Sequence, residues 1–130
     1  MQYALDRLII FLVSAAIVGC SSAPPKKNAD EWIGYTEKGK ASFYADKHQF
    51  EKTASGERYN HNLKTAAHRT IPFGSKIEVT NINNGKSVVA VVNDRGPFVN
   101  GRIVDLSKSA FSSVGNTSLG LISVQIEVIE

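Results

Sequence analysis

The chain has 130 residues, a formal net charge of +3 at pH 7 and 42% hydrophobic residues. Its lysines are scattered rather than gathered in a stripe, so charge excludes a dedicated nucleic-acid binder. The histidines, His48, His61 and His68, form no close ligand pair, and the one cysteine, Cys20, has no partner. We therefore expect neither a metal nor another cofactor.

The N-terminal residues 1–19 have the composition of a signal peptide. Arg7 precedes the apolar run Leu8–Val18, which as a helix would span roughly 16 Å, too short for a hydrocarbon core of about 30 Å. The run ends at Cys20 in the sequence IVGC, which resembles the lipobox of bacterial lipoproteins. We expect Cys20 to become the lipid-bearing first residue. The alternative is an incidental thiol in an ordinary signal peptide.

The residues after the cysteine indicate a place in the cell envelope. Ser21 and Ser22 follow it and no Asp adjoins it, which by resemblance to Gram-negative lipoproteins favours the outer membrane, facing the periplasm. Residues 20–39 are polar with two adjacent prolines and predict a flexible, lipid-anchored tether. Residues 40–130 are expected to form a single domain with a modest core.

The clearest local signal is a β-hairpin over Lys76–Val92. Two runs rich in β-branched residues flank Asn83-Asn84-Gly85, and these turn residues tolerate the positive φ of a tight turn. Upstream, Lys40–Ala45 has β-forming residues at its centre and predicts an earlier strand.

The C-terminal third predicts further short elements. Ile103–Val104 reads as a strand, and Asp105–Ser107 offers capping oxygens to a helix over Lys108–Val114. Gly115 is placed to end that helix, and alternation over Val124–Ile129 predicts a last strand. Short strands with one helix favour a small closed all-β barrel, because closure removes exposed edges.

Three segments carry the residues that are capable of chemistry. They are TASGERY at 53–59, TAAHRTIPFG at 65–74, and VNDRGPF at 92–98 followed by GRIVDLS at 101–107. Together they resemble the rare lipoprotein A family of septal-ring lytic transglycosylases, over residues 39–130. The resemblance implies a six-stranded double-psi β-barrel with one or two short helices, a fold shared with expansins. It also implies a peptidoglycan substrate, with a preference for glycan that lacks stem peptides.

The chemistry implied by the resemblance is a lyase reaction without water. A carboxylic acid protonates the β-1,4 oxygen between N-acetylmuramic acid and N-acetylglucosamine, and the sugar's own 6-hydroxyl closes a 1,6-anhydro ring. One carboxyl can serve both steps, unlike the pair that hydrolytic glycosidases need. Such an acid must be protonated near neutral pH, which burial or a neighbouring negative charge favours.

Three residues are the catalytic candidates. Asp94 is the first choice for the acid because it ends a valine-rich strand, which would place it at a barrel rim; the alternative is a turn residue bonded to backbone. Glu57 matches an acidic residue of the family, or is a plain exposed glutamate. His68 matches the family's histidine and would orient a carboxyl or bond a sugar hydroxyl, unless it is a core histidine bonded to backbone.

Four further residues are substrate-binding candidates. Asp105 is a rival acid, with helix capping as an equally good explanation. Arg69 and Arg95 are expected to contact glycan or fix carboxylates, although surface arginines are ordinary. Tyr44 would stack on a sugar face or fill the core.

The preferred interpretation is a lytic transglycosylase whose partners are peptidoglycan glycan strands and, through Cys20, the membrane. Divisome proteins are further candidate partners. Two alternatives stay open: a binding module without activity, as in expansins, and a structural or divisome-interacting lipoprotein. Sequence does not separate them, because binding also uses acids to bond sugar hydroxyls.

Overall fold

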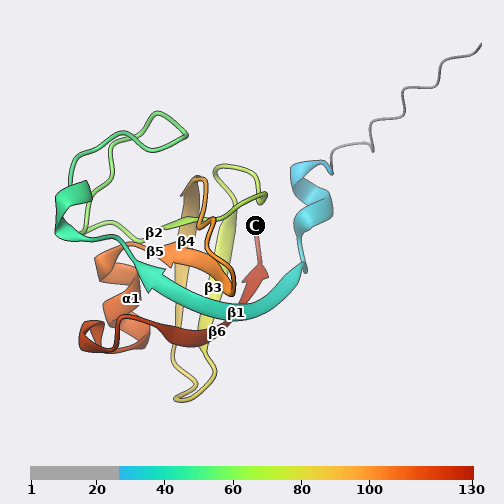
Figure 1. Cartoon of the computed structure of the whole chain (residues 1–130). Coiled ribbons are helices and arrows are strands. Elements are labelled where there is room, and N and C mark those ends of the chain that lie inside the picture. The colour runs from blue at the N-terminus through green and yellow to red at the C-terminus, as the bar shows by residue number, and fades with distance from the viewer. Residues whose placement is uncertain (1–26) are drawn as a thin grey trace, which may run out of the picture.

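The computed structural model describes residues 27–130, so the expected signal peptide and Cys20 lie outside the described part. Six strands close into a barrel in the order β1-β5-β2-β4-β3-β6 (Figure 1). The strands are β1 (Thr36–Phe43), β2 (Thr65–Ala67), β3 (Lys76–Asn81), β4 (Ser87–Asp94), β5 (Arg102–Leu106) and β6 (Ile122–Val128). The predicted six-stranded all-β barrel is confirmed.

Within residues 27–130, four short helices lie outside the barrel strands. They are η1 (Ala29–Trp32), η2 (Asp46–His48), α1 (Lys108–Val114) and η3 (Thr117–Leu119). The cap of α1 is Ser107, whose Oγ accepts the N–H of Ala110 at 3.3 Å, so Asp105 does not cap the helix. Across residues 27–130 no helix is both long and apolar enough to cross a bilayer.

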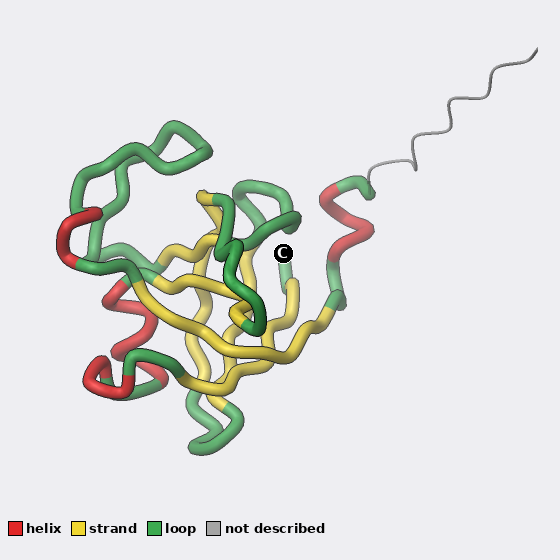
Figure 2. Tube along the Cα trace, in the orientation of Figure 1, coloured by secondary structure: helices red, strands yellow, loops and turns green. Residues whose placement is uncertain are grey.

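The barrel combines two parallel strand pairs with four antiparallel ones. β1 lies parallel to β5, and β2 lies parallel to β4. Parallel neighbours cannot be joined by a tight hairpin, so the chain must cross the barrel between them. The connection from β1 to β2, residues 44–64, extends from the barrel as a long loop (Figure 2).

The predicted hairpin is present, with a slightly longer turn. β3 and β4 pair antiparallel from Lys76 opposite Val91 to Thr80 opposite Ser87. Gly85 has φ 73° and donates its N–H to the carbonyl of Asn81 at 2.8 Å. The positive φ explains why glycine is favoured there.

The folded part begins earlier than the sequence predicted. β1 starts at Thr36 rather than Lys40, and Trp32 and Tyr35 pack against the barrel core. The N–H of Gly34 donates to the carbonyl of Val128 at 2.8 Å. Part of the segment predicted as a tether therefore belongs to the fold: residues 34–39 are hydrogen-bonded to β6 or its end, and the rings of Trp32 and Tyr35 pack against the core.

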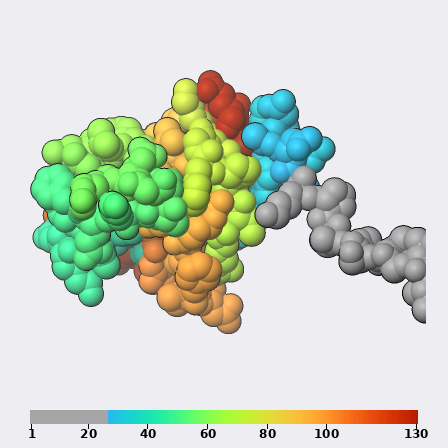
Figure 3. Space-filling view, turned by 90° about the horizontal axis from the view of Figure 1, so that it is seen from above, coloured from blue at the N-terminus to red at the C-terminus, as the bar shows by residue number. Residues whose placement is uncertain are grey.

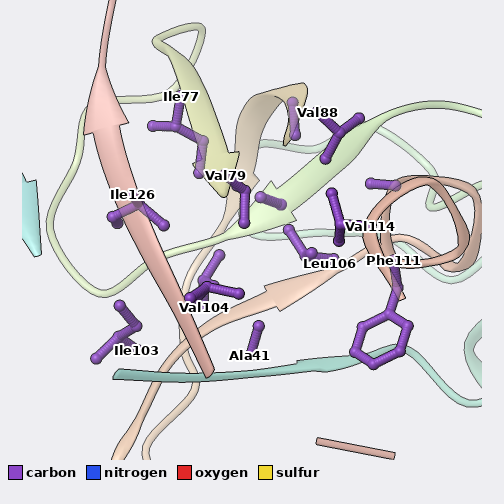
Figure 4. Close-up of a cluster of buried hydrophobic side chains, with 14 of the residues drawn as sticks. Ala41, Ile77, Val79, Val88, Ile103, Val104, Leu106, Phe111, Val114 and Ile126 are labelled. Atoms are coloured by element: carbon purple, nitrogen blue, oxygen red, sulfur yellow. The ribbon is translucent and has the colours of Figure 1, made fainter. Parts of the chain in front are cut away.

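Branched aliphatic side chains fill the barrel, and Phe111 of α1 belongs to the same buried cluster (Figure 4). The largest of them include Ile77, Val79, Leu106 and Ile126, all fully buried. Each such side chain contributes about 1.5–3 kcal/mol by leaving water. This core fixes the strand registers on which the candidate site depends.

Candidate active site

A row of four residues runs across four neighbouring strands on the outer face of the barrel. Ser42 pairs with Asp105, Asp105 with Ala67, and Ala67 with Asp94. Directly opposed residues point to the same face of a sheet, and Leu106, the next residue after Asp105, points into the core. Both candidate acids therefore face outward, with their backbones two strand spacings or roughly 10 Å apart.

Asp94 is held at the end of β4 by neutral donors. Its Oδ1 accepts the N–H of Ala54 at 2.8 Å and the N–H of Arg95 at 2.9 Å. Its Oδ2 is 2.5 Å from the hydroxyl of Tyr44. Within residues 27–130, Oδ2 has no other hydrogen-bond partner. The turn-type bond to the next N–H is present, as the alternative interpretation expected, but the other two contacts come from distant parts of the chain.

Tyr44 lies immediately after β1 and turns its hydroxyl toward the acids. Its ring packs against Tyr59, with centroids 4.3 Å apart, and edge-on against His48. Burial and the hydrogen bond to Asp94 raise the pKa of Tyr44 well above its ordinary value, and the charge of Asp105 adds to this. Because Tyr59 covers one ring face, a role for Tyr44 in binding substrate rests mainly on its hydroxyl.

Asp105 has a different environment. Its Oδ1 accepts hydrogen bonds from Ser42 Oγ and, at 2.5 Å, from the Nη2 of Arg102. Arg102 also donates to Ser42 at 2.6 Å. Ser42 and Arg102 were not singled out from the sequence. Ser42 is opposite Asp105 in the pairing of β1 with β5, and Arg102 lies three residues before Asp105 on β5.

Glu57 lies on a loop that is bonded to Asp94 through its backbone. Ala54 donates to the Asp94 carboxylate, and Ser55 N–H donates to the carbonyl of Asn93 at 3.2 Å. Glu57 itself is exposed, and its Oε1 is 3.4 Å from Ser55 Oγ. The structure thus brings the Glu57 loop to the acid, while no hydrogen bond joins the two carboxylates.

His68 is 3% exposed, and both ring nitrogens are occupied. Nδ1 accepts the N–H groups of Thr70 and Ile71 at 3.1 Å each, so the proton is on Nε2, which lies 2.9 Å from Glu37 Oε2. Burial lowers the pKa of His68, partly opposed by Glu37. Its link to Asp94 is through backbone: the His68 N–H donates to the Asp94 carbonyl at 3.1 Å.

The two arginines are bonded to loop carbonyls. Arg69 donates to Pro97, Val99 and Arg102 at 2.6–3.1 Å and so fixes the loop between β4 and β5. Arg95 Nη1 donates to the carbonyls of His68 and Ile71, at 3.2 and 2.8 Å. Neither arginine contacts a carboxylate in the described part of the chain, so the expected role of fixing an acid is not seen.

The row and Tyr44 together place two carboxyl groups and a phenol on one face of the barrel. Residues 27–130 contain no group of three or more His, Cys, Asp or Glu side chains that would hold a metal ion. The arrangement offers one carboxylate with neutral donors and a second with a cation, on the same face of the barrel and separated by β2.

Comparison with known sequences identifies the family. A family model described as "Lytic transglycolase" matches residues 36–126, which include every strand start and all residues of the row. The chain belongs to this lytic transglycosylase family. Its residues 36–126 contain the whole of the site described above.

Several relatives in the family are named endolytic peptidoglycan transglycosylase RlpA. The protein from Vibrio cholerae is 51% identical over 96 residues, and those from Pasteurella multocida and Neisseria meningitidis are each 47% identical, over 104 and 105 residues. These alignments cover 74–81% of this chain. The chain spans only 35% of the Pasteurella protein and 36% of the Vibrio protein.

Solved structures with the same fold are more distant. The Streptomyces papain inhibitor superposes with a TM-score of 0.63 at 20% identity, covering 75% of this chain and 97% of that one. A Clavibacter michiganensis expansin mutant in complex with cellohexaose gives 0.57 at 19% identity, covering 74% and 51%. Together with the family match, they establish the double-psi β-barrel fold.

Proposed function

We propose that this protein is an endolytic peptidoglycan transglycosylase that uses Asp94 as its acid and base. It would cleave the β-1,4 bond between N-acetylmuramic acid and N-acetylglucosamine and leave 1,6-anhydro ends. The observation that carries the proposal is the Asp94 carboxylate, fixed on the outer face by Ala54, Arg95 and Tyr44. The family membership and the RlpA relatives support the reaction class.

In the proposal, the acidic proton is carried by one oxygen of Asp94. Oδ1 already accepts two N–H bonds, so a proton on Asp94 resides on Oδ2, next to Tyr44. A phenol both donates and accepts, so Tyr44 can bond Oδ2 whether or not it carries the proton. Tyr44 therefore acts as a positioning residue for the acid.

The reaction then balances with one carboxyl. Asp94 gives its Oδ2 proton to the glycosidic oxygen as the bond from that oxygen to the sugar's C1 breaks. The 6-hydroxyl oxygen of N-acetylmuramic acid bonds to C1, and its proton returns to Asp94. The nucleophile is the sugar's own 6-hydroxyl, so neither water nor a nucleophile of the enzyme is used, in contrast to glycoside hydrolysis.

Three other residues support this centre in the proposal. Glu57 bonds substrate from the loop that carries Ala54, and Asp105 bonds sugar hydroxyls from the next strand but one. His68 holds the end of β4 by its backbone, and its buried ring anchors the following loop. The proposed substrate is glycan that lacks stem peptides, as the resemblance to the rare lipoprotein A family implies, and the acids of the row would bond its hydroxyl groups.

The experiment is digestion of peptidoglycan stripped of stem peptides, with the products analysed by mass spectrometry. The proposal expects fragments ending in 1,6-anhydro-N-acetylmuramic acid. Reducing ends instead would indicate a hydrolase. Binding without any cleavage would favour the expansin-like alternative, in which Asp94 is a ligand for sugar hydroxyls.

We further propose that the protein is an outer-membrane lipoprotein lipidated at Cys20. The sequence IVGC and the serines after it support this. Intact-mass measurement of membrane-extracted protein should show a diacylglyceryl and an N-acyl group on Cys20. A free thiol there, or a mature chain that starts elsewhere, would rule it out. Divisome proteins remain candidate partners, testable by co-purification from crosslinked cells.

A further inference from the structure

A second feature of the surface lies between the N-terminal segment and the barrel. Here a hollow of about 420 Å³ opens beside η1. Its lining residues are Lys27, Trp32, Arg69, Thr70, Pro72 and Arg95. The volume is in the range of small-molecule sites and suits one substituted sugar.

The lining of the hollow is cationic and has no carboxylate. Lys27, Arg69 and Arg95 contribute three positive charges, and none of them forms an ion pair within residues 27–130. Lys27 Nζ lies over the rings of Trp32 and Tyr35, 5.2 and 5.9 Å from their centroids. Three cations without a counter-charge in one hollow favour an anionic ligand.

The two arginines are fixed in place and keep free donors. Arg69 uses Nε and Nη2 for carbonyls, which leaves Nη1. Arg95 uses Nη1, and its guanidinium lies 4.0 Å from the ring centroid of Phe73, which leaves Nε and Nη2. A guanidinium has five N–H donors in a rigid fork that suits a carboxylate. Because the backbone already holds these groups, little side-chain entropy is lost when they bind an anion.

The hollow also has apolar walls. Trp32 is partly exposed and packs edge-on against Tyr35, with centroids 5.0 Å apart. Pro72 lies among the other lining residues. An indole face and a pyrrolidine ring are flat, poorly hydrated surfaces that can pack against the C–H groups of a sugar ring. The hollow therefore matches a sugar that carries an acid.

The hollow begins next to the proposed acid. Arg95 directly follows Asp94, and His68 joins them by donating its N–H to Asp94 and accepting from Arg95 at its carbonyl. Seen from above, the loop of residues 45–64 (green) and η1 (blue) lie at opposite ends of one face, with residues 66–75 between them (Figure 3). A glycan crossing this face past Asp94 would meet the hollow further along.

We propose that the hollow is a subsite for the free lactyl carboxylate of an N-acetylmuramic acid residue; the inference rests on the proposed glycan substrate. When a stem peptide is present, the lactyl group is an uncharged amide that continues into peptide. Removal of the stem converts it to a carboxylate, which Arg69, Arg95 and Lys27 would bind while Trp32 packs on the sugar. The charge of the hollow thus selects stem-free glycan.

Binding of three soluble sugars to the purified full chain tests the ligand chemistry. N-acetylmuramic acid should bind, and its methyl ester and N-acetylglucosamine should bind at least tenfold more weakly, by titration calorimetry or NMR titration. The acid's affinity should also fall as salt is raised. Equal affinity for the acid and the ester would overturn the proposal. N-acetylmuramoyl-L-alanyl-D-isoglutamine distinguishes the source of the carboxylate: tighter binding of this stem-bearing ligand would assign the hollow to peptide carboxylates.

Binding measurements on single variants test whether the acid binds in this hollow. Lys27→Gln should weaken binding of the acid several-fold and leave the ester unchanged, and Trp32→Ala should weaken both. Lys38→Gln, an exposed position on β1 away from the hollow, should change neither. Wild-type affinity in both Lys27→Gln and Trp32→Ala would place the acid elsewhere and overturn the proposal.

The two proposals fail separately. Lys27→Gln should reduce the preference for stem-free over stem-bearing glycan while anhydro ends still form, and Asp94→Asn should still bind the free acid. A chain that binds the acid in this pattern but never yields anhydro ends would refute the activity alone. A chain that cleaves with unchanged preference in Lys27→Gln would refute the subsite alone.

Discussion

The two acids of the row share one face of the barrel and differ in their partners. Asp94 is bonded to two backbone N–H groups and a phenol, whereas Asp105 is bonded to Ser42 and to the guanidinium of Arg102. Asp105 therefore forms an ion pair, whereas every donor to the Asp94 carboxylate in residues 27–130 is uncharged. The difference shows that corresponding positions on two strands separated by β2 acquire different chemistry from the side chains beside them.

The substitution Asp94→Asn tests the difference between the two acids most directly, and we expect it to have the largest effect. The amide keeps the oxygen that accepts from Ala54 and Arg95 but has no acidic proton to give. Turnover of stem-free glycan should fall by a factor on the order of 10² or more, with folding stability little changed. Anhydro ends measured by mass spectrometry and a thermal melt give the two readouts. Normal cleavage by this variant would remove Asp94 as the acid.

Tyr44→Phe should have the next largest effect. The variant leaves Asp94 Oδ2 without its hydroxyl partner, so we expect kcat to fall about tenfold with KM nearly constant. Stability should decrease by about 1 kcal/mol, the usual value of one hydrogen bond. Tyr35→Phe is the matched control, because its hydroxyl bonds Glu37 and not an acid of the row. A rise in KM alone would indicate that Tyr44 binds sugar instead.

Asp105→Asn should be milder in activity, with a loss of only a few-fold. The side chain remains bonded to Ser42, but Arg102 loses its ion pair on a partly buried surface, so stability should fall by about 1 kcal/mol. Denaturant unfolding and the glycan digest measure the two effects. If Asp105→Asn abolished cleavage while Asp94→Asn cleaved normally, the assignment of the two acids would be reversed.

His68 is a buried base whose backbone is bonded to Asp94 at the end of β4, and it gives a prediction about pH. Burial, with the charges of Arg95 and Arg69, lowers its pKa from 6.5 despite the opposing Glu37. Neutral His68 is therefore favoured in the folded state. Its contribution to stability is complete above about pH 6.5 and is lost as pH falls below that, by at most about 1.4 kcal/mol per pH unit.

Unfolding in urea between pH 7.5 and 5 measures this dependence. His68→Gln should start less stable and show a flatter pH profile; His48→Gln, at a more exposed histidine, is the matched control for the loss of an imidazole. An unchanged slope in His68→Gln would mean that other groups carry the acid sensitivity.

Much of the fold followed from local pattern, and what was missed has physical reasons. The hairpin, α1 and β6 have turn residues, caps and alternation that act over a few residues. β2 consists only of Thr65, Ala66 and Ala67, and alanine has little strand preference. Its pairing with β4 and β5 forms it, and such contacts are not visible in the sequence of the segment itself.

The sequence identified most residues of the candidate site but few of the contacts between them. Asp94 at a strand end followed from the valine run, and the motifs named Glu57 and His68. The contact of Tyr44 with Asp94 joins residues 50 apart in sequence, and the contact of Arg102 with Asp105, three residues apart on β5, occurs beside a register shift in the pairing with β1. Glu37 as the partner of His68 was missed, because its only signal was an acidic residue in a segment expected to be a tether.

The place of β1 in the closed barrel has a mechanical consequence. β1 is hydrogen-bonded along one side to β5 and along the other to β6 (Figure 1). Tension on the chain upstream of Thr36 would pull along this strand, so the hydrogen bonds of both ladders would have to shear together instead of opening one at a time. A barrel held in this way resists extraction by its N-terminal end, which suits the proposed arrangement of a membrane anchor at Cys20 and a glycan strand held by the barrel.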